Sequence, residues 1–450
     1  MIEKAGLGPL FFVAVDAARL VNSSARPANL KSDGPHYSLS IGLYRALIQI
    51  RKHRPMTSKY LIIGATGALG HAFAKALQDA GLHATLLVRD RRKAVALFEN
   101  TNGFTIVEGD LNDTALLNNI AEGTEFIFHG ANASYEHWET AMPVMTRNVI
   151  NAAERSGATV IFPGNNYNFG KTDQPISEIT PFNPSAPLGK VRVDLEKMLQ
   201  RAANQGRIRT LIVRMAEIWG PNVTNKQFAP VFENALKGKA MPWLISTEPA
   251  QQLLYAPDAG RAIVALTQDR DRKTYEVVNI GGTLVPSIQI WLEQIAGVAG
   301  VQAKVSVVPK FMLSLLGRGI PLMREVATMS YKYETSVILN DEKFRASHPD
   351  FKLTPMNTAI ADTLAWFKAN GTGALAKSKA RRMGRIDGAV RFVVDNVAIG
   401  VFPAILAILA SQVPALEGFL PYLAVAAGIY WTPGLHKLTN HLRSRFSKTT

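Results

Sequence analysis

Three glycines in this chain have the spacing of a phosphate-binding turn. Gly64, Gly67 and Gly70 follow the short apolar run 60–63, which predicts a buried strand, and a helical pattern begins near Ala68. Such glycines permit a tight turn and a close backbone approach, and the N-terminus of the following helix attracts an anion. We therefore expect a bound dinucleotide. The residues predicted to hold its phosphates are Gly64, Thr66, Gly67, Ala68, Leu69 and Gly70.

The residue after the second predicted strand bears on the choice of cofactor. That strand covers 83–88, and Arg89 follows it directly. In dinucleotide-binding folds an acidic residue here binds the ribose 2′-hydroxyl of NAD, whereas a basic residue accommodates the 2′-phosphate of NADP. Arg89 therefore favours NADP, with NAD as the alternative. A solvated charge run at the start of a helix would also explain Arg89, because 90–93 is charged throughout.

The elements that would position these residues alternate between strands and helices. The further short apolar runs that predict strands are 104–108, 125–128, 159–162 and 210–213, and a helix is predicted over 141–156. Strands that alternate with helical segments in this way indicate an α/β fold with a Rossmann-like, doubly wound parallel sheet.

Composition excludes some kinds of chemistry and suggests a partner. The 450 residues include no cysteine, so disulfides, thiolate nucleophiles and cysteine-bound metals are excluded, and no metal site is predicted. The formal net charge is +15, which favours an anionic partner. Nucleic acid is not expected, because no recognition motif accompanies the charge.

The chain resembles the short-chain dehydrogenase/reductase superfamily, in its extended or atypical branch of NAD-dependent epimerase/dehydratase-like and NmrA-like proteins. The resemblance covers about 57–370. The segments that carry it are 64–70, 109–111, 165–170, 214–221, 255–258, 278–282 and 340–344. It implies that Asp110, with Leu111 beside it, contacts the adenine and that Gly130 and Ala131 line the nicotinamide side. It also implies a smaller substrate lobe, mainly 228–243 and 256–350, within a domain over 56–370.

The resemblance exposes a gap in the expected catalytic residues. The family uses a tyrosine as general acid/base and a lysine four residues later on one helical face. The corresponding positions here hold Leu188 and Arg192. Leucine transfers no proton, and arginine, with a pKa above about 12, stays charged. Arg192 remains able to bind the ribose or a phosphate of the cofactor.

Two replacements for the missing pair are available in the sequence. Tyr167 and Lys171 are four residues apart near the end of the fifth predicted strand, where a substrate would sit, and Lys190 is an alternative charged partner. We expect an NAD(P)-dependent oxidoreductase acting on a carbonyl, a quinone or another apolar substrate. A catalytically silent nucleotide sensor or accessory subunit of a membrane complex is the rival hypothesis. A nucleotide-sugar epimerase or dehydratase is a lesser alternative, since those reactions also rely on the tyrosine.

Aromatic residues in the predicted smaller lobe weakly favour an apolar substrate. Trp219, Phe228, Trp243 and Tyr255 would give an aromatic pocket, although ordinary core packing would also place them there. Glu217 is a candidate polar contact in such a pocket. The oligomeric state does not follow from the sequence.

The two ends of the chain differ from the domain between them. Residues 1–55 are predicted to be a disordered extension or an upstream arm, with Met56 as a natural start. A basic linker over 371–388 precedes 389–450, which holds two apolar segments with basic ends. Such a pair predicts a helical hairpin associated with an anionic membrane from its cytoplasmic face. The alternative is a helical pair that packs on the reductase domain or on a partner protein.

Overall fold

The computed structural model describes residues 58–371, apart from residues 99, 270, 272 and 318–320. The predicted extension over 1–55 lies outside the described residues, and so do the basic linker, apart from residue 371, and the hairpin over 389–450. Within the described part, no helix is both long and apolar enough to cross a membrane.

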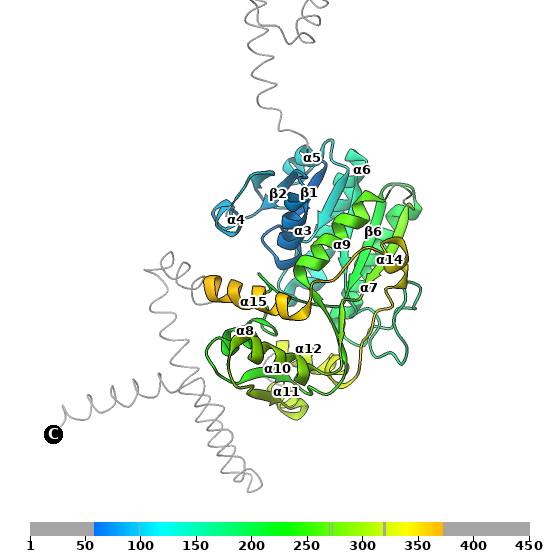
Figure 1. Cartoon of the computed structure of the whole chain (residues 1–450). Helices are drawn as coiled ribbons and strands as arrows, with labels where there is room; N and C mark the ends of the chain where they lie inside the picture. Colours follow the sequence, from blue (N-terminus) through cyan, green and yellow to red (C-terminus); the bar gives the residue numbers. More distant parts are fainter. Residues whose placement is uncertain (1–57, 99, 270, 272, 318–320, 372–450) are drawn as a thin grey trace, which may run out of the picture. The chain divides into compact units, whose positions relative to one another are not determined.

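A parallel sheet of seven strands forms the larger part of the described structure (Figure 1). Its strands are β1 (Tyr60–Ile63), β2 (Ala84–Val88), β3 (Phe104–Glu108), β4 (Phe126–His129), β5 (Thr159–Gly164), β6 (Arg209–Met215) and β10 (Tyr275–Ile280). Their spatial order is β10-β6-β5-β4-β1-β2-β3, and every pair is parallel. This order confirms the predicted Rossmann-like fold, in which the chain reverses its direction of travel between β1 and β4.

Helices cover both faces of the sheet. The helices that connect its strands are α3 (Ala68–Asp79), α4 (Arg91–Phe98), α5 (Thr114–Ala121), α6 (Trp138–Ser156), α7 (Pro187–Asn204) and α9 (Ala256–Gln268). Right-handed crossovers place the helices before and after the reversal on opposite faces. Helices α3 and α9 cross closely at Gly260. A Cβ at this position would lie 2.3 Å from the carbonyl oxygen of Ala72, so the crossing requires glycine.

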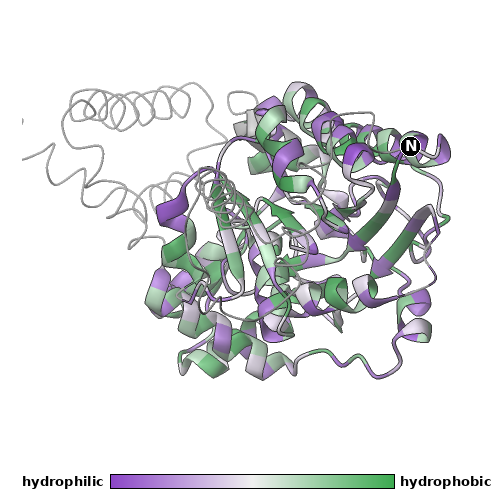
Figure 2. Ribbon diagram, turned by 90° about the horizontal axis from the view of Figure 1, so that it is seen from above, coloured by the Kyte–Doolittle hydropathy of each residue, from purple (hydrophilic) through white to green (hydrophobic). Residues whose placement is uncertain are grey.

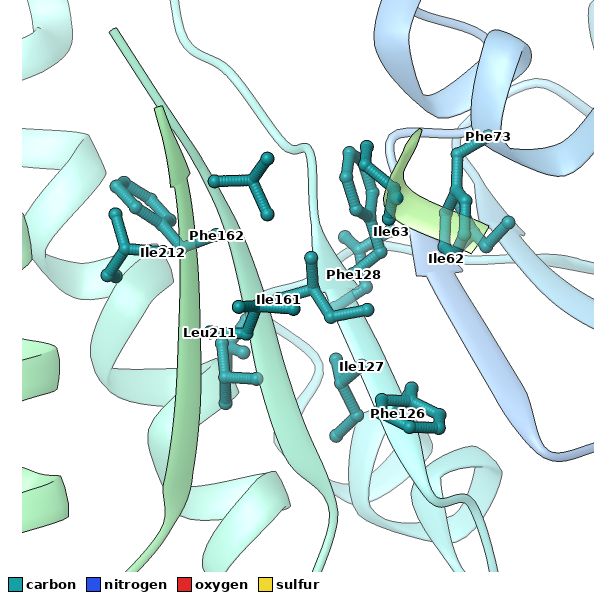
Figure 3. Close-up of a cluster of buried hydrophobic side chains, with 14 of the residues drawn as sticks. Ile62, Ile63, Phe73, Phe126, Ile127, Phe128, Ile161, Phe162, Leu211 and Ile212 are labelled. Carbon is teal, nitrogen blue, oxygen red and sulfur yellow. The ribbon is translucent and has the colours of Figure 1, made fainter. Parts of the chain in front are cut away.

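The core explains why the strand sequences are apolar without alternation. Both faces of the sheet are covered, so successive side chains are buried on opposite sides. Ile62, Phe128 and Ile161 show this packing in neighbouring strands (Figure 3). Hydrophobic residues are prominent along the central strands, and hydrophilic residues on the outer helices (Figure 2).

The smaller lobe consists of two short sheets and their helices. Its strands are β7 (Glu217–Trp219), β8 (Met241–Leu244), β9 (Gln251–Tyr255), β11 (Thr283–Val285) and β12 (Val305–Val308), in the orders β11-β9-β7 and β12-β8. Its helices are α8 (Ala229–Ala235), α10 (Ile288–Ala299), α11 (Lys310–Leu316), α12 (Pro321–Thr328) and α13 (Tyr331–Glu334), with α14 (Glu342–Ser347) and α15 (Met356–Asn370) following. The range 256–350, predicted for the smaller lobe, is thus divided between the two parts of the structure. Helix α9 and strand β10 belong to the main sheet and its helical layers.

The aromatic residues considered for a substrate pocket form the core of this lobe. Trp219, Phe228, Trp243 and Tyr255 are all buried. The ring of Trp291 packs edge-on against Trp219, with centroids 5.3 Å apart. Core packing therefore accounts for these residues, and none of them lines the cavity at the carboxyl ends of the sheet strands that is described below.

Candidate functional site

A cavity of about 340 Å³ opens at the carboxyl ends of β1, β4, β5 and β6. We call it the main cavity. It lies where the strand order reverses, which is where ligands bind in open α/β sheets. The residues that line it are Gly67, Ala68, Leu69, Gly70, His129, Gly130, Ala131, Asn132, Tyr135, Trp138, Pro163, Gly164, Asn165, Asn166, Tyr167, Arg192, Met215, Ala216, Glu217, Ile218, Val223 and Asn225.

The glycine turn has the geometry of a phosphate cradle. Gly64 has φ +81°, and a Cβ there would lie 2.5 Å from the carbonyl oxygen of Gly130. The N–H of Gly67 donates to Gly64 O at 3.0 Å, which closes the turn. No side chain caps the N-terminus of α3, so its first N–H groups are left to a ligand.

Replacing Gly70 by alanine should weaken nucleotide binding. Its Cβ would lie 2.3 Å from Gly64 O and 2.9 Å from the Cα of Ala65, so the backbone of the turn must shift. Overpacking of about 1–3 kcal/mol corresponds to a Kd about 5- to 150-fold higher. Titration of NADPH fluorescence measures this change. Gly297→Ala, in α10 with open space around it, is the matched control and should leave Kd unchanged; equal Kd values in both variants would contradict the cradle.

The predicted cofactor residues are distributed between the cavity wall and its surroundings. Gly67, Ala68, Leu69, Gly70, Gly130, Ala131 and Arg192 line the cavity. Gly64 and Thr66 belong to the turn itself, and Asn222 of the smaller lobe donates from Nδ2 to Thr66 O at 3.4 Å.

Arg89, Asp110 and Leu111 follow β2 and β3, and they do not line the main cavity. Leu111 is buried, whereas Arg89 and Asp110 are exposed. The Asp110 carboxylate accepts from the N–H of Asn112 at 2.8 Å. β2 adjoins β1 in the sheet, so Arg89 lies at the same edge as the glycine turn, on the side where a cofactor's adenosine would extend.

Arg192 is held deep in the wall of the cavity. Its Nη2 donates to the carbonyl oxygen of Pro163, and its guanidinium carbon lies 4.5 Å from the centroid of the Phe162 ring. Burial lowers the pKa of Arg192, while the nearby Glu196 opposes that shift. Its Nε has no hydrogen-bond partner among the described residues. This donor is therefore available to an atom of a bound ligand.

His129 adds a second unsatisfied group to the same wall. Its Nε2 lies 3.0 Å from Thr146 Oγ1, and its buried Nδ1 has no partner within the described part of the chain. Burial, followed by the charge of Arg192, lowers the pKa of His129 to about 3. The imidazole is therefore neutral at physiological pH, and it contributes a polar contact rather than a charge.

Neither pair considered from the sequence, Leu188 with Arg192 or Tyr167 with Lys171, has both of its residues at the main cavity. Leu188 is buried at the start of α7 and does not line the cavity. Tyr167 does line it, but Lys171 and Lys190 are exposed and lie outside the lining. A spacing of four residues brings side chains together only on a helix, and Tyr167 lies in a turn. The structure therefore places Tyr167, but not Lys171, at the cavity.

A lysine from the smaller lobe lies against Tyr167 instead. Nζ of Lys332, in α13, is 4.3 Å from the centroid of the Tyr167 ring and 2.5 Å from Glu217 Oε1. Burial opposes the charge of Lys332, but Glu217 and Tyr167 outweigh that effect and raise its pKa well above the ordinary value. Nothing in the local sequence around Lys332 indicated this contact, because the fold brings it to Tyr167 from a distant part of the chain.

A second phenol accompanies Tyr167 at the cavity. The neighbouring Tyr167, together with burial, raises the pKa of Tyr135 to about 12. The lining of the main cavity thus includes two phenol hydroxyl groups and one carboxylate, that of Glu217. Such groups can donate a proton to, or accept one from, a substrate oxygen. No cluster of metal-binding side chains occurs among the described residues.

Comparison with known proteins agrees with this fold. Residues 60–281 match the model of the NAD dependent epimerase/dehydratase family. No curated protein sequence matches the chain. A UDP-N-acetylglucosamine 4-epimerase from Methanobrevibacter ruminantium M1, solved in complex with UDP-N-acetylmuramic acid, shares 16% identity over 70% of this chain and 99% of its own, with a TM-score of 0.57.

Two further solved structures hold NAD. A UDP-glucuronic acid 4-epimerase from Bacillus cereus, in complex with UDP-glucuronic acid and NAD, is 17% identical over 69% of this chain and 99% of its own, with a TM-score of 0.57. A dTDP-glucose 4,6-dehydratase double mutant from Streptomyces venezuelae, with NAD bound, is 18% identical over 70% of this chain and 98% of its own, also with a TM-score of 0.57. These likenesses show a shared fold.

Proposed function

Because the chain belongs to the short-chain dehydrogenase/reductase superfamily, among its extended, epimerase/dehydratase-like members, we propose that it is an NADP-dependent oxidoreductase for a neutral carbonyl, quinone or other apolar substrate. One observation carries the proposal. The main cavity joins the glycine cradle to Tyr167, a residue able to transfer a proton. NAD in the related structures supports a nicotinamide dinucleotide, and Arg89 is the reason to favour NADP.

The residues of this chain divide the work between binding and proton transfer. The glycine turn and the N-terminus of α3 hold the pyrophosphate, and Arg192 binds the ribose on the nicotinamide side. A bound nicotinamide would supply a hydride to the carbon of a carbonyl substrate, or two electrons as hydride to a quinone, and would accept a hydride in the reverse direction. Tyr167 donates the proton that the substrate oxygen needs, and solvent returns a proton to Tyr167. Leu188 has no part in the chemistry.

The charges of the cavity favour a neutral substrate over a nucleotide sugar. Arg192 is the only arginine or lysine among the lining residues of the described structure, and it lies beside Pro163, at the nicotinamide side. A nucleoside diphosphate group carries negative charges that proteins usually meet with arginine or lysine. Glu217 forms an ion pair with the Lys332 ammonium at 2.5 Å, so these two residues add no net positive charge that would bind such a group.

The test of this function separates binding from turnover. NADPH fluorescence is titrated first, and turnover is then screened with carbonyl and quinone substrates. Binding with oxidation of at least one substrate supports the oxidoreductase. Binding without any turnover favours the rival hypothesis, a nucleotide sensor or accessory subunit, which Leu188 and Arg192 at the family's tyrosine and lysine positions support.

Arg89→Ala should alter the choice between the two cofactors. Loss of a charged contact to the 2′-phosphate costs about 1.5–3 kcal/mol, so the Kd of NADPH should rise about 10- to 150-fold while that of NADH stays the same. Paired titrations of the two nucleotides measure this. Arg92→Ala removes a neighbouring exposed charge and serves as control. An equal change for NADPH and NADH would contradict recognition of the 2′-phosphate.

The proposal includes an attachment to the cytoplasmic face of an anionic membrane through 389–450. The support is the sequence of that segment, with its uncharged runs 396–416 and 418–435 and its basic ends. Flotation of the full chain with vesicles tests it. Binding to anionic but not to neutral vesicles supports lipid attraction, binding to both supports insertion, and binding to neither contradicts both.

A further inference from the structure

We infer that Lys332 is a positioning residue that fixes Tyr167 and Glu217 in the wall of the main cavity, so that the smaller lobe completes the catalytic site. The inference rests on the proposed function, in which Tyr167 transfers the proton. It assigns to Lys332 the supporting role for which the sequence suggested Lys171 or Lys190.

The contacts of Lys332 are those of a residue fixed in one place. Its side chain is 6% exposed, and its ammonium lies between the Glu217 carboxylate, at 2.5 Å, and the face of the Tyr167 ring, at 4.3 Å. A buried ammonium is costly unless a counter-ion and an electron-rich face surround it. Both partners line the main cavity, whereas Lys332 itself does not. Lys332 therefore acts through them.

The backbone that carries Lys332 is held equally firmly. Nε2 of Gln251, in β9, donates to the carbonyl oxygens of Lys332 at 3.0 Å and Thr335 at 3.1 Å. The hydroxyl of Tyr333 donates to Gln227 Oε1 at 3.3 Å. These bonds tie the short helix α13 to the lobe on both sides of the lysine. The ammonium is thus held in one place, and its contact with the Tyr167 ring limits the movement of the turn that carries Tyr167.

The position of the proton donor matters more for the chemical step than for nucleotide binding. A displacement of about 1 Å at a reacting group can lower the rate about 100-fold. Lys332 does not touch the glycine turn that holds the nucleotide. Loss of Lys332 should therefore lower kcat about 10- to 100-fold and leave the Kd of NADPH unchanged.

The experiment compares variants of the full chain saturated with NADPH. Tyrosine is labelled with 13C at Cζ, and Tyr167→Phe assigns the resonance of Tyr167. In Lys332→Met this resonance should shift, because the ammonium over the ring is lost, and in Lys332→Arg it should return towards the wild-type position with kcat partly restored. Lys310→Met removes a half-exposed lysine of α11 that pairs at 2.7 Å with Glu334 of α13, the helix that carries Lys332. This control should change neither the resonance nor kcat.

A second variant guards against a folding defect. Lys332→Met leaves Glu217 without its counter-ion, so the double variant Lys332→Met/Glu217→Gln removes both charges and keeps a side chain of similar shape. An unchanged Tyr167 resonance in both variants overturns the inference, and so does a shifted resonance with wild-type kcat. If the wild-type protein binds NADPH and turns over no substrate, the proposed oxidoreductase fails, while the resonance still decides whether Lys332 positions Tyr167.

Discussion

Replacing Glu196 by glutamine should lower the free energy of unfolding by about 3–5 kcal/mol, because it leaves Arg214 as a buried charge without a counter-ion. Glu196, in α7, and Arg214, in β6, have side chains that are 0% and 2% exposed, with Nη2 2.8 Å from Oε2. Asn168 donates from Nδ2 to the other carboxylate oxygen at 2.7 Å. The ion pair therefore also anchors the turn that carries Tyr167.

A surface pair provides the matched control for this measurement. Arg207 binds both oxygens of Glu154, at 2.9 and 2.5 Å, but both side chains are exposed to solvent. Glu154→Gln should change stability little, since exposed pairs are screened by water. Urea denaturation of both variants measures the contrast. Equal losses would contradict the role of the buried pair, as would a double variant, Glu196→Leu/Arg214→Met, that is less stable than Glu196→Gln.

Replacing Tyr167 by phenylalanine should lower kcat about 100- to 10,000-fold, the usual contribution of a positioned proton donor. The ring that packs against Lys332 remains, so the shape of the wall is kept and only the hydroxyl is lost. The Kd of NADPH should change little, because Tyr167 is not part of the glycine turn that holds the phosphates of the nucleotide. Steady-state kinetics and an NADPH titration on the same preparations measure both quantities.

Tyr135→Phe is the matched control for Tyr167→Phe. Both phenols line the main cavity, but Tyr135 is 44% exposed to solvent, whereas the ring of Tyr167 is held against the Lys332 ammonium at 4.3 Å. Its removal should therefore have the smaller effect on kcat. Unchanged kcat in Tyr167→Phe, or a larger loss in Tyr135→Phe, would exclude Tyr167 as the proton donor.

The parts of this structure that the sequence predicted well are those determined by neighbouring residues. The glycine turn between the strand 60–63 and the helix from Ala68 depends only on residues next to one another in the sequence. The structure shows the strand, the turn and the helix where they were predicted. The parallel sheet followed from the alternation of apolar runs and helical segments. β10 is the exception: it falls within the range 256–350 predicted for the smaller lobe, yet it pairs with β6 at the edge of the main sheet.

The catalytic side of the site could not be predicted because its contacts are not local. Tyr167 and Lys171 have the helical spacing of four, but a turn over 166–169 points them to different surroundings. Lys332 reaches Tyr167 only through the packing of α13 against β9, and no spacing in the sequence records that contact. The aromatic residues of the smaller lobe suggested a pocket, although Trp219 and its neighbours are needed for its core.

Transfer of deuterium from NADPH labelled at C4 of the nicotinamide tests the central claim most directly. The full chain is incubated with either of the two labelled epimers and with each carbonyl or quinone substrate, and the deuterium content of the NADP⁺ formed is measured by mass spectrometry. If the main cavity serves hydride chemistry, NADP⁺ from one epimer should lose its deuterium and NADP⁺ from the other should keep it, and a carbonyl product should carry the lost label on carbon. Tyr167→Phe should slow this transfer about 100- to 10,000-fold while NADPH still binds. Binding of NADPH with no NADP⁺ formed from either epimer would contradict the account.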